Sequence, residues 1–227
     1  MISMISAPIY NIFIFGGNMI KKIVFDLDNT LLEWKDEYIF ALAKVIKKLN
    51  LNYNDEKIKE IDRAITDYEN HFNFCTKESF LNFINEECNV KLPLEFVDLL
   101  IDEQGKCFEE YTGKKLETIK YLSKKYELIC ITNWFTKTQA LRLNNAKIGK
   151  YFSLISGGDE HELKPSLKAF DMIDKPEECV MVGDRLKFDI YPALNVGMQG
   201  ILLTNKHMKK NSRYKIIKKL EDLKEML

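Results

Sequence analysis

Two aspartates that directly follow a short apolar run are the side chains of this sequence best suited to chemistry. Asp26 and Asp28 come after Ile23–Phe25, and Asn29 and Thr30 follow them. Charged residues usually avoid the end of a buried strand. Two like charges this close repel each other, so one of them tends to hold a proton or to seek a cation. The pair therefore indicates a site for a metal ion, for a proton shuttle, or for both.

Short apolar runs elsewhere in the chain predict the elements that position these aspartates. Each run has strand length and lacks clean alternation, which is typical of a parallel sheet covered by helices on both faces. The predicted strands are Ile23–Phe25, Leu128–Thr132, Leu154–Ser156, Cys179–Val182 and Gly200–Leu203. Apolar residues at helical spacing predict helices over Leu116–Tyr126, Thr138–Ala146, Ser166–Ile173, Lys187–Leu194 and Tyr214–Leu227. The fold class predicted is α/β, with a doubly wound parallel sheet.

A second unit interrupts this rhythm between the first and second predicted strands. Residues 35–112 contain no convincing strand but four amphipathic segments, which are enough for a small bundle of their own. The last segment opens at Pro93 and is expected to run to Tyr111, where Gly113 ends it. The predicted parts are an α/β core over 19–34 and 113–227, an inserted all-α domain over 35–112, and an N-terminal extension over 1–18.

Polar residues gather at the carboxyl ends of the predicted strands. They are Asp26, Asp28, Thr132, Asn133, Asp184 and Asp189. In open parallel sheets, ligands bind in the crevice beyond these strand ends. We therefore expect these side chains to belong to one site.

Four short motifs occur in order along the chain and resemble those of a known family. They are DLDNTL at 26–31, ITN at 131–133, KPS at 164–166 and GDRLKFD at 183–189. These motifs are similar to the four motifs of the haloacid dehalogenase-like (HAD) hydrolase superfamily, and the resemblance covers the chain from about Met19 to Leu203. The helical insertion after the first motif resembles the type 1 cap of that family.

The resemblance implies a role for each matching residue. Asp26 matches the nucleophile that attacks phosphorus, and Asp28 matches the general acid and base. Thr132 matches the hydroxyl that holds a phosphoryl oxygen, and Asn133 beside it is expected to bind substrate. Lys164 matches the lysine that neutralises the nucleophile and the transferring group; Lys168 is its rival in the sequence.

The resemblance also implies a magnesium ion. Its expected ligands are the carboxylates of Asp26 and Asp184 and the main-chain carbonyl of Asp28, in keeping with the preference of Mg2+ for oxygen. Asp189 matches the second acid of the last motif, which supports Lys164 or the metal's waters. In the family's dehalogenases the counterpart of Asp28 is not an aspartate and no metal is needed, so Asp28 favours phosphatase chemistry over dehalogenation.

The function expected is that of a cytoplasmic, Mg2+-dependent phosphatase acting on a small phosphorylated metabolite, such as a sugar phosphate, a triose phosphate or a nucleoside monophosphate. A sugar phosphomutase with the same core residues is one alternative. A non-catalytic binding protein on the same scaffold is another, although a binder would not need Asp28. Trp34 and Lys35 are candidates for substrate selectivity. Trp134 is expected either to form a wall of the pocket or to turn away and pack.

Composition sets the remaining expectations. The chain has 227 residues and no net charge, so nothing favours a nucleic-acid partner. Its five cysteines form no C-x-x-C pair, which favours a reducing compartment and free thiols. The apolar run over 9–15 is too short to span a membrane, and Met19 is an alternative start of translation. We expect a monomer or a small homo-oligomer.

Overall fold

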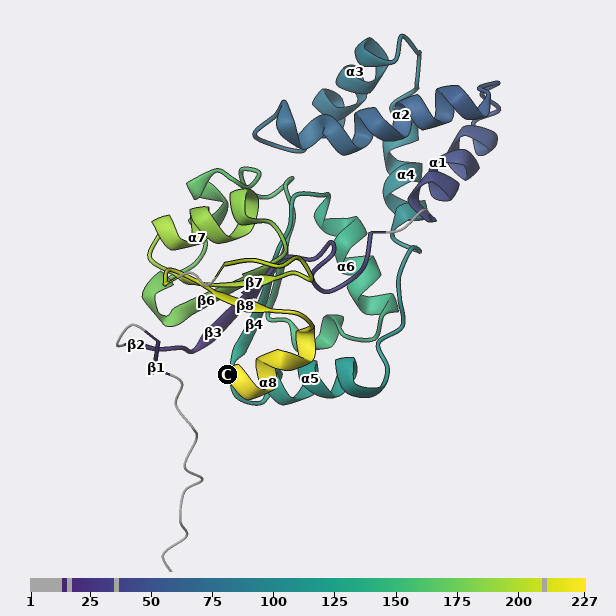
Figure 1. The fold of residues 1–227 in the computed structure, drawn as a ribbon. Coiled ribbons are helices and arrows are strands. Elements are labelled where there is room, and N and C mark those ends of the chain that lie inside the picture. Colours follow the sequence, from purple (N-terminus) through teal and green to yellow (C-terminus); the bar gives the residue numbers. More distant parts are fainter. Residues whose placement is uncertain (1–13, 16–17, 35–36, 210–211) are drawn as a thin grey trace, which may run out of the picture.

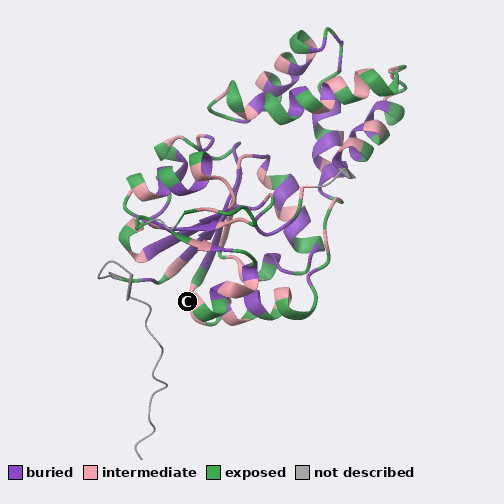
Figure 2. Cartoon of the chain, in the orientation of Figure 1, coloured by how far each residue is buried: buried purple, intermediate pink, exposed green. Residues whose placement is uncertain are grey.

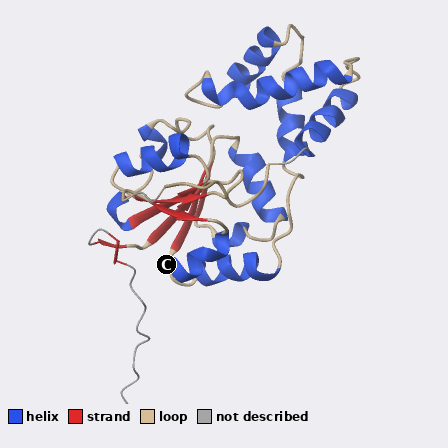
Figure 3. Cartoon of the chain, in the orientation of Figure 1, coloured by secondary structure: helices blue, strands red, loops and turns tan. Residues whose placement is uncertain are grey.

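Six parallel strands form the central sheet, in a computed structural model that describes residues 14–15, 18–34, 37–209 and 212–227. Their order across the sheet is β5-β4-β3-β6-β7-β8. Figure 3 shows the sheet in red with helices in blue around it. The bounds are β3 Lys22–Phe25, β4 Glu127–Ile131, β5 Leu154–Ser156, β6 Cys179–Gly183, β7 Gln199–Leu203 and β8 Lys215–Ile217. This arrangement confirms the predicted α/β fold with a doubly wound parallel sheet.

Alternate residues of the central strand β3 enter two separate apolar layers, one on each face of the sheet. Ile23 and Phe25 pack into the layer that also holds Ile119 of helix α5 (Gly113–Ser123), whereas Val24 packs into the layer that holds Phe170. Helices α6 (Thr136–Asn145) and α8 (Leu223–Met226) lie with α5 on the first face (Figure 1). Helix α7 (Tyr191–Asn195) covers the other. The purple sheet in Figure 2 shows this two-sided burial, which explains the continuous apolar runs.

Four helices inserted after β3 form what we call the helical unit, residues 37–104. They are α1 Glu37–Lys48, α2 Asp55–Asp67, α3 Lys77–Glu87 and α4 Glu95–Gln104, with a short 3-10 helix Tyr68–Asn70 after α2. The Asn54 and Thr76 side chains cap the starts of α2 and α3 by accepting backbone N–H groups. Trp134, Phe135 and Leu163 from the α/β core join the apolar cluster of this unit. The helical unit is therefore packed onto the core at the edge where the strands end.

The helix predicted over Tyr214–Leu227 is wrong. Lys215–Ile217 instead forms β8, which extends the sheet beside β7, and only Leu223–Met226 is α-helical. Adjacent β-branched residues, Ile216 and Ile217, favour a strand once a sheet edge offers hydrogen bonds. The apolar spacing seen in the sequence arises because Ile217, Leu220, Leu223 and Leu227 all enter the same apolar layer.

The helices predicted over Leu116–Tyr126 and Thr138–Ala146 are present as α5 and α6 with ends shifted by up to three residues, and three other predicted helices differ more. The fourth helix of the helical unit ends at Gln104 rather than Tyr111, because it stops at Gly105, and Gly113 begins α5 instead of ending a helix. The segment 166–173 contains only the 3-10 helix Leu167–Phe170. Residues Leu186–Ile190 form a π-helix before α7, where Pro192 lacks the N–H that a regular α-helix needs.

Little of the predicted N-terminal extension falls within the described residues. Ile14–Phe15 (β1) and Asn18–Met19 (β2) pair in antiparallel fashion, and the rest of 1–18 lies outside the described part. Among the described residues, none of the helices has the length and apolar character required to cross a membrane.

Candidate active site

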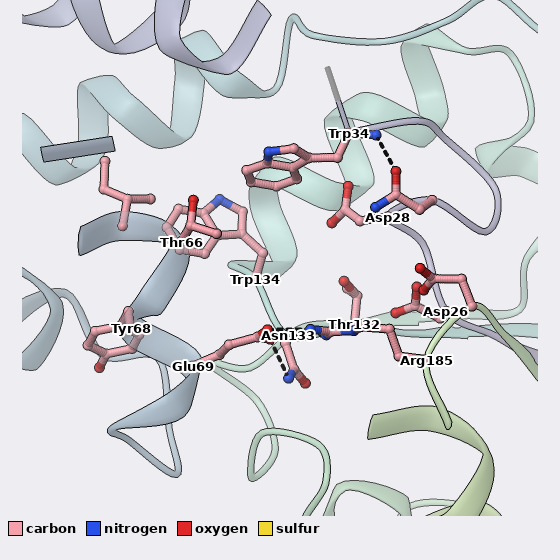
Figure 4. Close-up of a pocket in the computed structure, with 13 residues that line it drawn as sticks. Asp26, Asp28, Trp34, Thr66, Tyr68, Glu69, Thr132, Asn133, Trp134 and Arg185 are labelled. Carbon is pink, nitrogen blue, oxygen red and sulfur yellow. Dashed lines mark hydrogen bonds and ion pairs between the residues drawn. The ribbon is translucent and has the colours of Figure 1, made fainter. Parts of the chain in front are cut away.

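Asp26 and Asp28 lie in the turn that leaves the centre of the sheet. The Asp26 N–H donates to the Val182 carbonyl at 2.9 Å, so β3 is still joined to β6 where it delivers its first carboxylate. The chain then turns through Asn29, whose φ of 60° is one that asparagine tolerates better than most residues. Asp26 is only 4% exposed, and both Asp26 and Asp28 line the cavity that is described below (Figure 4).

Lys164 lies against the carboxylate of Asp26. Its Nζ is 2.6 Å from Asp26 Oδ1 and 2.6 Å from Asp189 Oδ1, and the side chain is fully buried. Burial lowers the pKa of Lys164, but the ion pairs with Asp189 and Asp26 outweigh it and hold the pKa above the usual range. Lys168, its rival in the sequence, is exposed and pairs with Glu162.

Three carboxylates, those of Asp26, Asp184 and Asp189, come within 4.8 Å of one another. Asp189 accepts one hydrogen bond on each carboxylate oxygen, from Lys164 Nζ and from the Arg185 N–H. Burial raises the pKa of Asp184 to about 6. Burial also raises the pKa of Asp26, against the opposing effect of Lys164. Burial and mutual repulsion both disfavour negative charge on these carboxylates, and a divalent cation bound between them would offset both effects. A donor set made only of oxygen atoms fits magnesium better than a softer metal.

Asp28 is held by two side chains of α6 that the sequence did not single out. Arg142 Nη1 donates to Asp28 Oδ1 at 2.5 Å, and Gln139 Nε2 donates to Asp28 Oδ2 at 2.9 Å. Gln139 Nε2 also lies 2.9 Å from Thr132 Oγ1, and Arg142 Nη1 donates to Gln139 Oε1 at 2.7 Å. Arg142 is 1% exposed. The network thus fixes the second aspartate relative to the predicted phosphate-binding hydroxyl.

Arg142 also contacts the segment that returns from the helical unit to the core, and the first helix of that unit. Its Nε donates to the Cys107 carbonyl at 3.0 Å on the return segment. Its guanidinium lies 5.0 Å from the ring of Tyr38, near the start of α1. The sequence gives one signal that these two side chains act together. Gln139 and Arg142 are three residues apart, so they share a face of a helix whose Leu143 enters the core.

Asn133 holds the loop that carries Lys164. Its Nδ2 donates to the Lys164 carbonyl at 2.8 Å, and its Oδ1 accepts the Lys164 N–H at 2.8 Å. Asn133 Nδ2 also donates to Glu69 Oε2 at 2.9 Å. The amide expected to bind substrate is thus fully engaged in positioning the lysine and the helical unit. Thr132, next to it, is 2% exposed and lines the cavity.

Glu69 and Arg185 meet across the cavity from the two parts of the chain (Figure 4). Glu69 belongs to the helical unit and Arg185 follows β6; Arg185 Nη1 contacts Glu69 Oε1, and Nη2 lies 3.2 Å from Oε2. Burial raises the pKa of Glu69, but the hydrogen bond and charge of Arg185 outweigh it and hold the pKa below the usual range. Neither residue was predicted, since nothing in the sequence indicates a pair 116 residues apart.

These side chains surround a cavity of about 200 Å³. Its wall comes from both parts of the chain: Asp26, Asp28, Asn29, Trp34, Ile65, Thr66, Tyr68, Glu69, Thr132, Asn133, Trp134, Asp184 and Arg185. Trp34, the predicted selectivity residue, lines it and stacks on Tyr38 with ring centres 3.9 Å apart. Lys35, the other candidate, lies outside the described residues. Trp134 lines the cavity, and its ring also packs in the apolar cluster of the helical unit while its Nε1 donates to Gln104 Oε1 at 2.9 Å.

Comparison with known proteins gives consistent matches over most of the chain. A model of the haloacid dehalogenase-like hydrolase family matches residues 23–203. Glyceraldehyde 3-phosphate phosphatase of Methanothermobacter thermautotrophicus is 28% identical, over 92% of this chain and 100% of that protein. Human N-acylneuraminate-9-phosphatase is 26% identical, over 85% of each chain. Among solved structures, the HAD-hydrolase YfnB of Bacillus subtilis, bound to magnesium, superposes with a TM-score of 0.68 at 20% identity, over 91% of this chain and 98% of that chain.

Proposed function

Since the chain belongs to the family of haloacid dehalogenase-like hydrolases, we propose that it is a Mg2+-dependent phosphatase that hydrolyses a small phosphorylated metabolite through a phosphoryl group carried on Asp26. The observation that carries this proposal is the placement of Asp26. Its carboxylate contacts the ammonium of Lys164 and lies within 4.8 Å of the carboxylate of Asp184, and the second aspartate, Asp28, lines the same cavity.

The first half of the reaction transfers the phosphoryl group to the protein. A carboxylate oxygen of Asp26 forms a bond to phosphorus while the bond from phosphorus to the substrate oxygen breaks. Asp28, in its protonated form, gives its proton to the departing oxygen, so that an alcohol leaves rather than an alkoxide. Thr132, which lines the same cavity, offers a hydroxyl to one of the phosphoryl oxygens. Splitting hydrolysis into two displacements in this way is ordinary nucleophilic catalysis.

The second half releases phosphate. Asp28, now a carboxylate, takes a proton from water as the water oxygen attacks phosphorus, and the bond to Asp26 breaks. Asp28 is suited to both steps because Arg142 and Gln139 each engage one of its oxygens, while every carboxylate oxygen keeps a further lone pair. Such anchoring fixes the distance from the acid-base group to the reacting oxygens, which is a large part of what catalysis requires.

The charges around Asp26 explain how a carboxylate approaches a phosphate dianion. Lys164 neutralises one side of the nucleophile at 2.6 Å. On the other side, Asp26 and Asp184, with the main-chain carbonyl of Asp28, would hold Mg2+, which when bound supplies positive charge at the phosphoryl oxygens. Preorganised positive charge at the transferring group accounts for most of the rate gain in phosphoryl transfer.

The cavity and its cover support a small substrate. A volume of about 200 Å³ suits a phosphoryl group with a leaving group of a few carbons. We propose that the helical unit acts as a cap that keeps bulk water from the site, and that Trp34 contributes to selectivity. We further propose a reducing compartment such as the cytoplasm, because all five cysteines are free thiols.

A sugar phosphomutase remains the alternative within the family, because it would use the same core residues. The relatives that match most of the chain are phosphatases by name, for glyceraldehyde 3-phosphate, for N-acylneuraminate 9-phosphate or for phosphoglycolate, which supports hydrolysis here. A non-catalytic binding protein is less well supported, because a binder has no use for the anchored carboxylate of Asp28.

A phosphate-release screen tests the proposal. The purified chain with Mg2+ should release inorganic phosphate from one or more small phosphate monoesters, and Asp26→Asn should release none. Return of an isomeric sugar monophosphate in place of free phosphate, in reactions primed with a sugar bisphosphate, would favour the phosphomutase. Absence of turnover on every monoester, including an aryl phosphate, would contradict both.

A further inference from the structure

We take the leaving group of a substrate to lie on the side of the cavity that the helical unit lines, and this leaving-group side contains an ion pair. Among the described residues that line the cavity, Arg185 is the only lysine or arginine. Glu69 binds its guanidinium through both carboxylate oxygens, and the guanidinium carbon lies 4.0 Å from the centre of the Phe188 ring. The charge that a second anionic group of a substrate would seek is thus already neutralised by the protein.

Glu69 is held in this position from more than one side. Its Oε2 accepts a hydrogen bond from Asn133 Nδ2 at 2.9 Å, in addition to its contact with Arg185. Its side chain is 21% exposed, and its neighbours in the 3-10 helix and α2, Tyr68 and Thr66, line the same cavity. Because two side chains hold the Glu69 carboxylate and little of it is exposed, water only partly screens its charge. The carboxylate therefore keeps its position in the cavity wall.

The other groups around the leaving-group side carry no positive charge to attract an anion. Trp34, Ile65 and Trp134 present apolar surface, and Thr66 presents a hydroxyl. Asp28 and Glu69 add two carboxylates, which are already paired with Arg142 and Arg185. A carboxylate on the leaving group would thus meet a like charge with its natural partner, Arg185, already occupied.

We propose that Glu69 is a specificity-determining residue: by occupying Arg185, it restricts the site to phosphate monoesters whose leaving group is uncharged, such as triose phosphates, and rejects those with a carboxylate near the phosphate. This inference rests on the proposed phosphatase function and narrows it to a substrate class. Selectivity by an unfavourable charge is a common way to reject a wrong ligand.

A matched pair of substrates tests the inference on the unaltered protein. 2-Phosphoglycolate and its amide differ only in the charge of the group beside the phosphate ester. At fixed free Mg2+, the native chain should hydrolyse the amide with a kcat/KM at least about tenfold higher, since like charges brought together in a partly buried site are strongly disfavoured. Equal values for the two compounds, or a preference for the acid, would overturn the inference.

The variant Glu69→Gln tests the residue itself. Removing the negative charge while keeping the side-chain shape should shift the ratio of kcat/KM, acid over amide, by about tenfold or more toward the acid. In Glu69→Gln/Arg185→Met that shift should be lost, because no cation then remains for the carboxylate. Glu60→Gln is the matched control: Glu60 lies on α2 and pairs with Lys57 outside the cavity, so the ratio should stay at its native value.

The outcomes separate this inference from the proposed function. If Glu69 were only a structural contact between the helical unit and the core, Glu69→Gln would lower kcat/KM for the acid and for the amide by the same factor. The ratio would then be unchanged, and this result would refute the proposed selectivity. If Glu69→Gln does not fold, as judged by circular dichroism, the comparison of acid and amide on the native chain still decides. Failure of the native chain to hydrolyse the amide, the acid and an aryl phosphate would instead count against the phosphatase function.

Discussion

Asp28→Asn should leave the protein able to accept a phosphoryl group on Asp26 but slow to release it. The substitution replaces one oxygen by an amide nitrogen, so position 28 can no longer take or give the proton that the two half-reactions need. Loss of general acid-base help typically costs about 10²–10⁴-fold in rate, or about 3–5 kcal/mol in the activation barrier.

The structure adds an effect on stability to this prediction. Asp28 now accepts from Arg142 Nη1 and from Gln139 Nε2, so both of its oxygens are acceptors. Asparagine offers one acceptor and one donor, and Gln139 cannot turn its amide without losing the hydrogen bond that it accepts from Arg142. One donor is left without an acceptor, which costs about 1–3 kcal/mol when buried. Asp28 is 23% exposed, so water will lower that cost, and we expect the melting temperature to fall by roughly 2–8 °C.

The choice of leaving group separates the two roles of Asp28. Nitrophenolate needs little protonation, so the first step with a nitrophenyl phosphate should suffer less than with an alkyl phosphate. The second step still lacks its base, so a phosphoryl adduct on Asp26 should accumulate. Intact-protein mass spectrometry after a rapid acid quench would detect it, and Asp26→Ala, which has no carboxylate to carry the adduct, should show none.

Two results would refute this reasoning. One is that Asp28→Asn hydrolyses alkyl phosphates as fast as the unaltered protein does, which would mean that no proton passes through this residue. The other is substantial activity in Asp26→Ala with no adduct in Asp28→Asn, which would mean that the two roles are reversed or that the reaction class is wrong.

Three further predictions follow from the same site. Excess chelator should abolish turnover, and Mg2+ affinity measured by calorimetry should tighten as the pH rises from 5 to 7, because burial raises the pKa of Asp184 to about 6 and the bound proton competes with the cation below that pH; an affinity that is flat with pH would contradict the assignment. Arg142→Lys keeps the charge but not the forked contacts, so kcat should fall by about tenfold or more with KM little changed, and more for alkyl than for nitrophenyl phosphate; equal loss on both would make Arg142 a support of the fold and not of Asp28. Trp34→Ala should alter the ranking of substrates in a phosphate-release panel while the smallest ester keeps its rate, and a uniform fall across the panel would show that Trp34 only packs on Tyr38.

The sequence alone determined five of the six strands of the sheet and the group of residues at its edge. Apolar runs located five strands to within one residue at each end, because buried parallel strands must be apolar on both faces. Once those strands are parallel, the residues after them meet at one edge, so Asp26, Thr132 and Asp184 were bound to come together. Lys164 could be placed only through its resemblance to a family motif, since no spacing rule links it to Asp26.

Tertiary structure decided the elements and contacts that depend on a partner distant in the sequence. Lys215–Ile217 is a strand because β7 offers it a free edge, whereas its spacing alone fits a helix equally well. Arg142 is buried on α6 because Asp28 and the Cys107 carbonyl lie within reach to compensate its charge. Glu69 faces Arg185 across 116 residues of chain. Local pattern reports which face of an element is buried, but a buried charge is stable only beside its partner, and that partner is chosen by how the helical unit packs on the sheet.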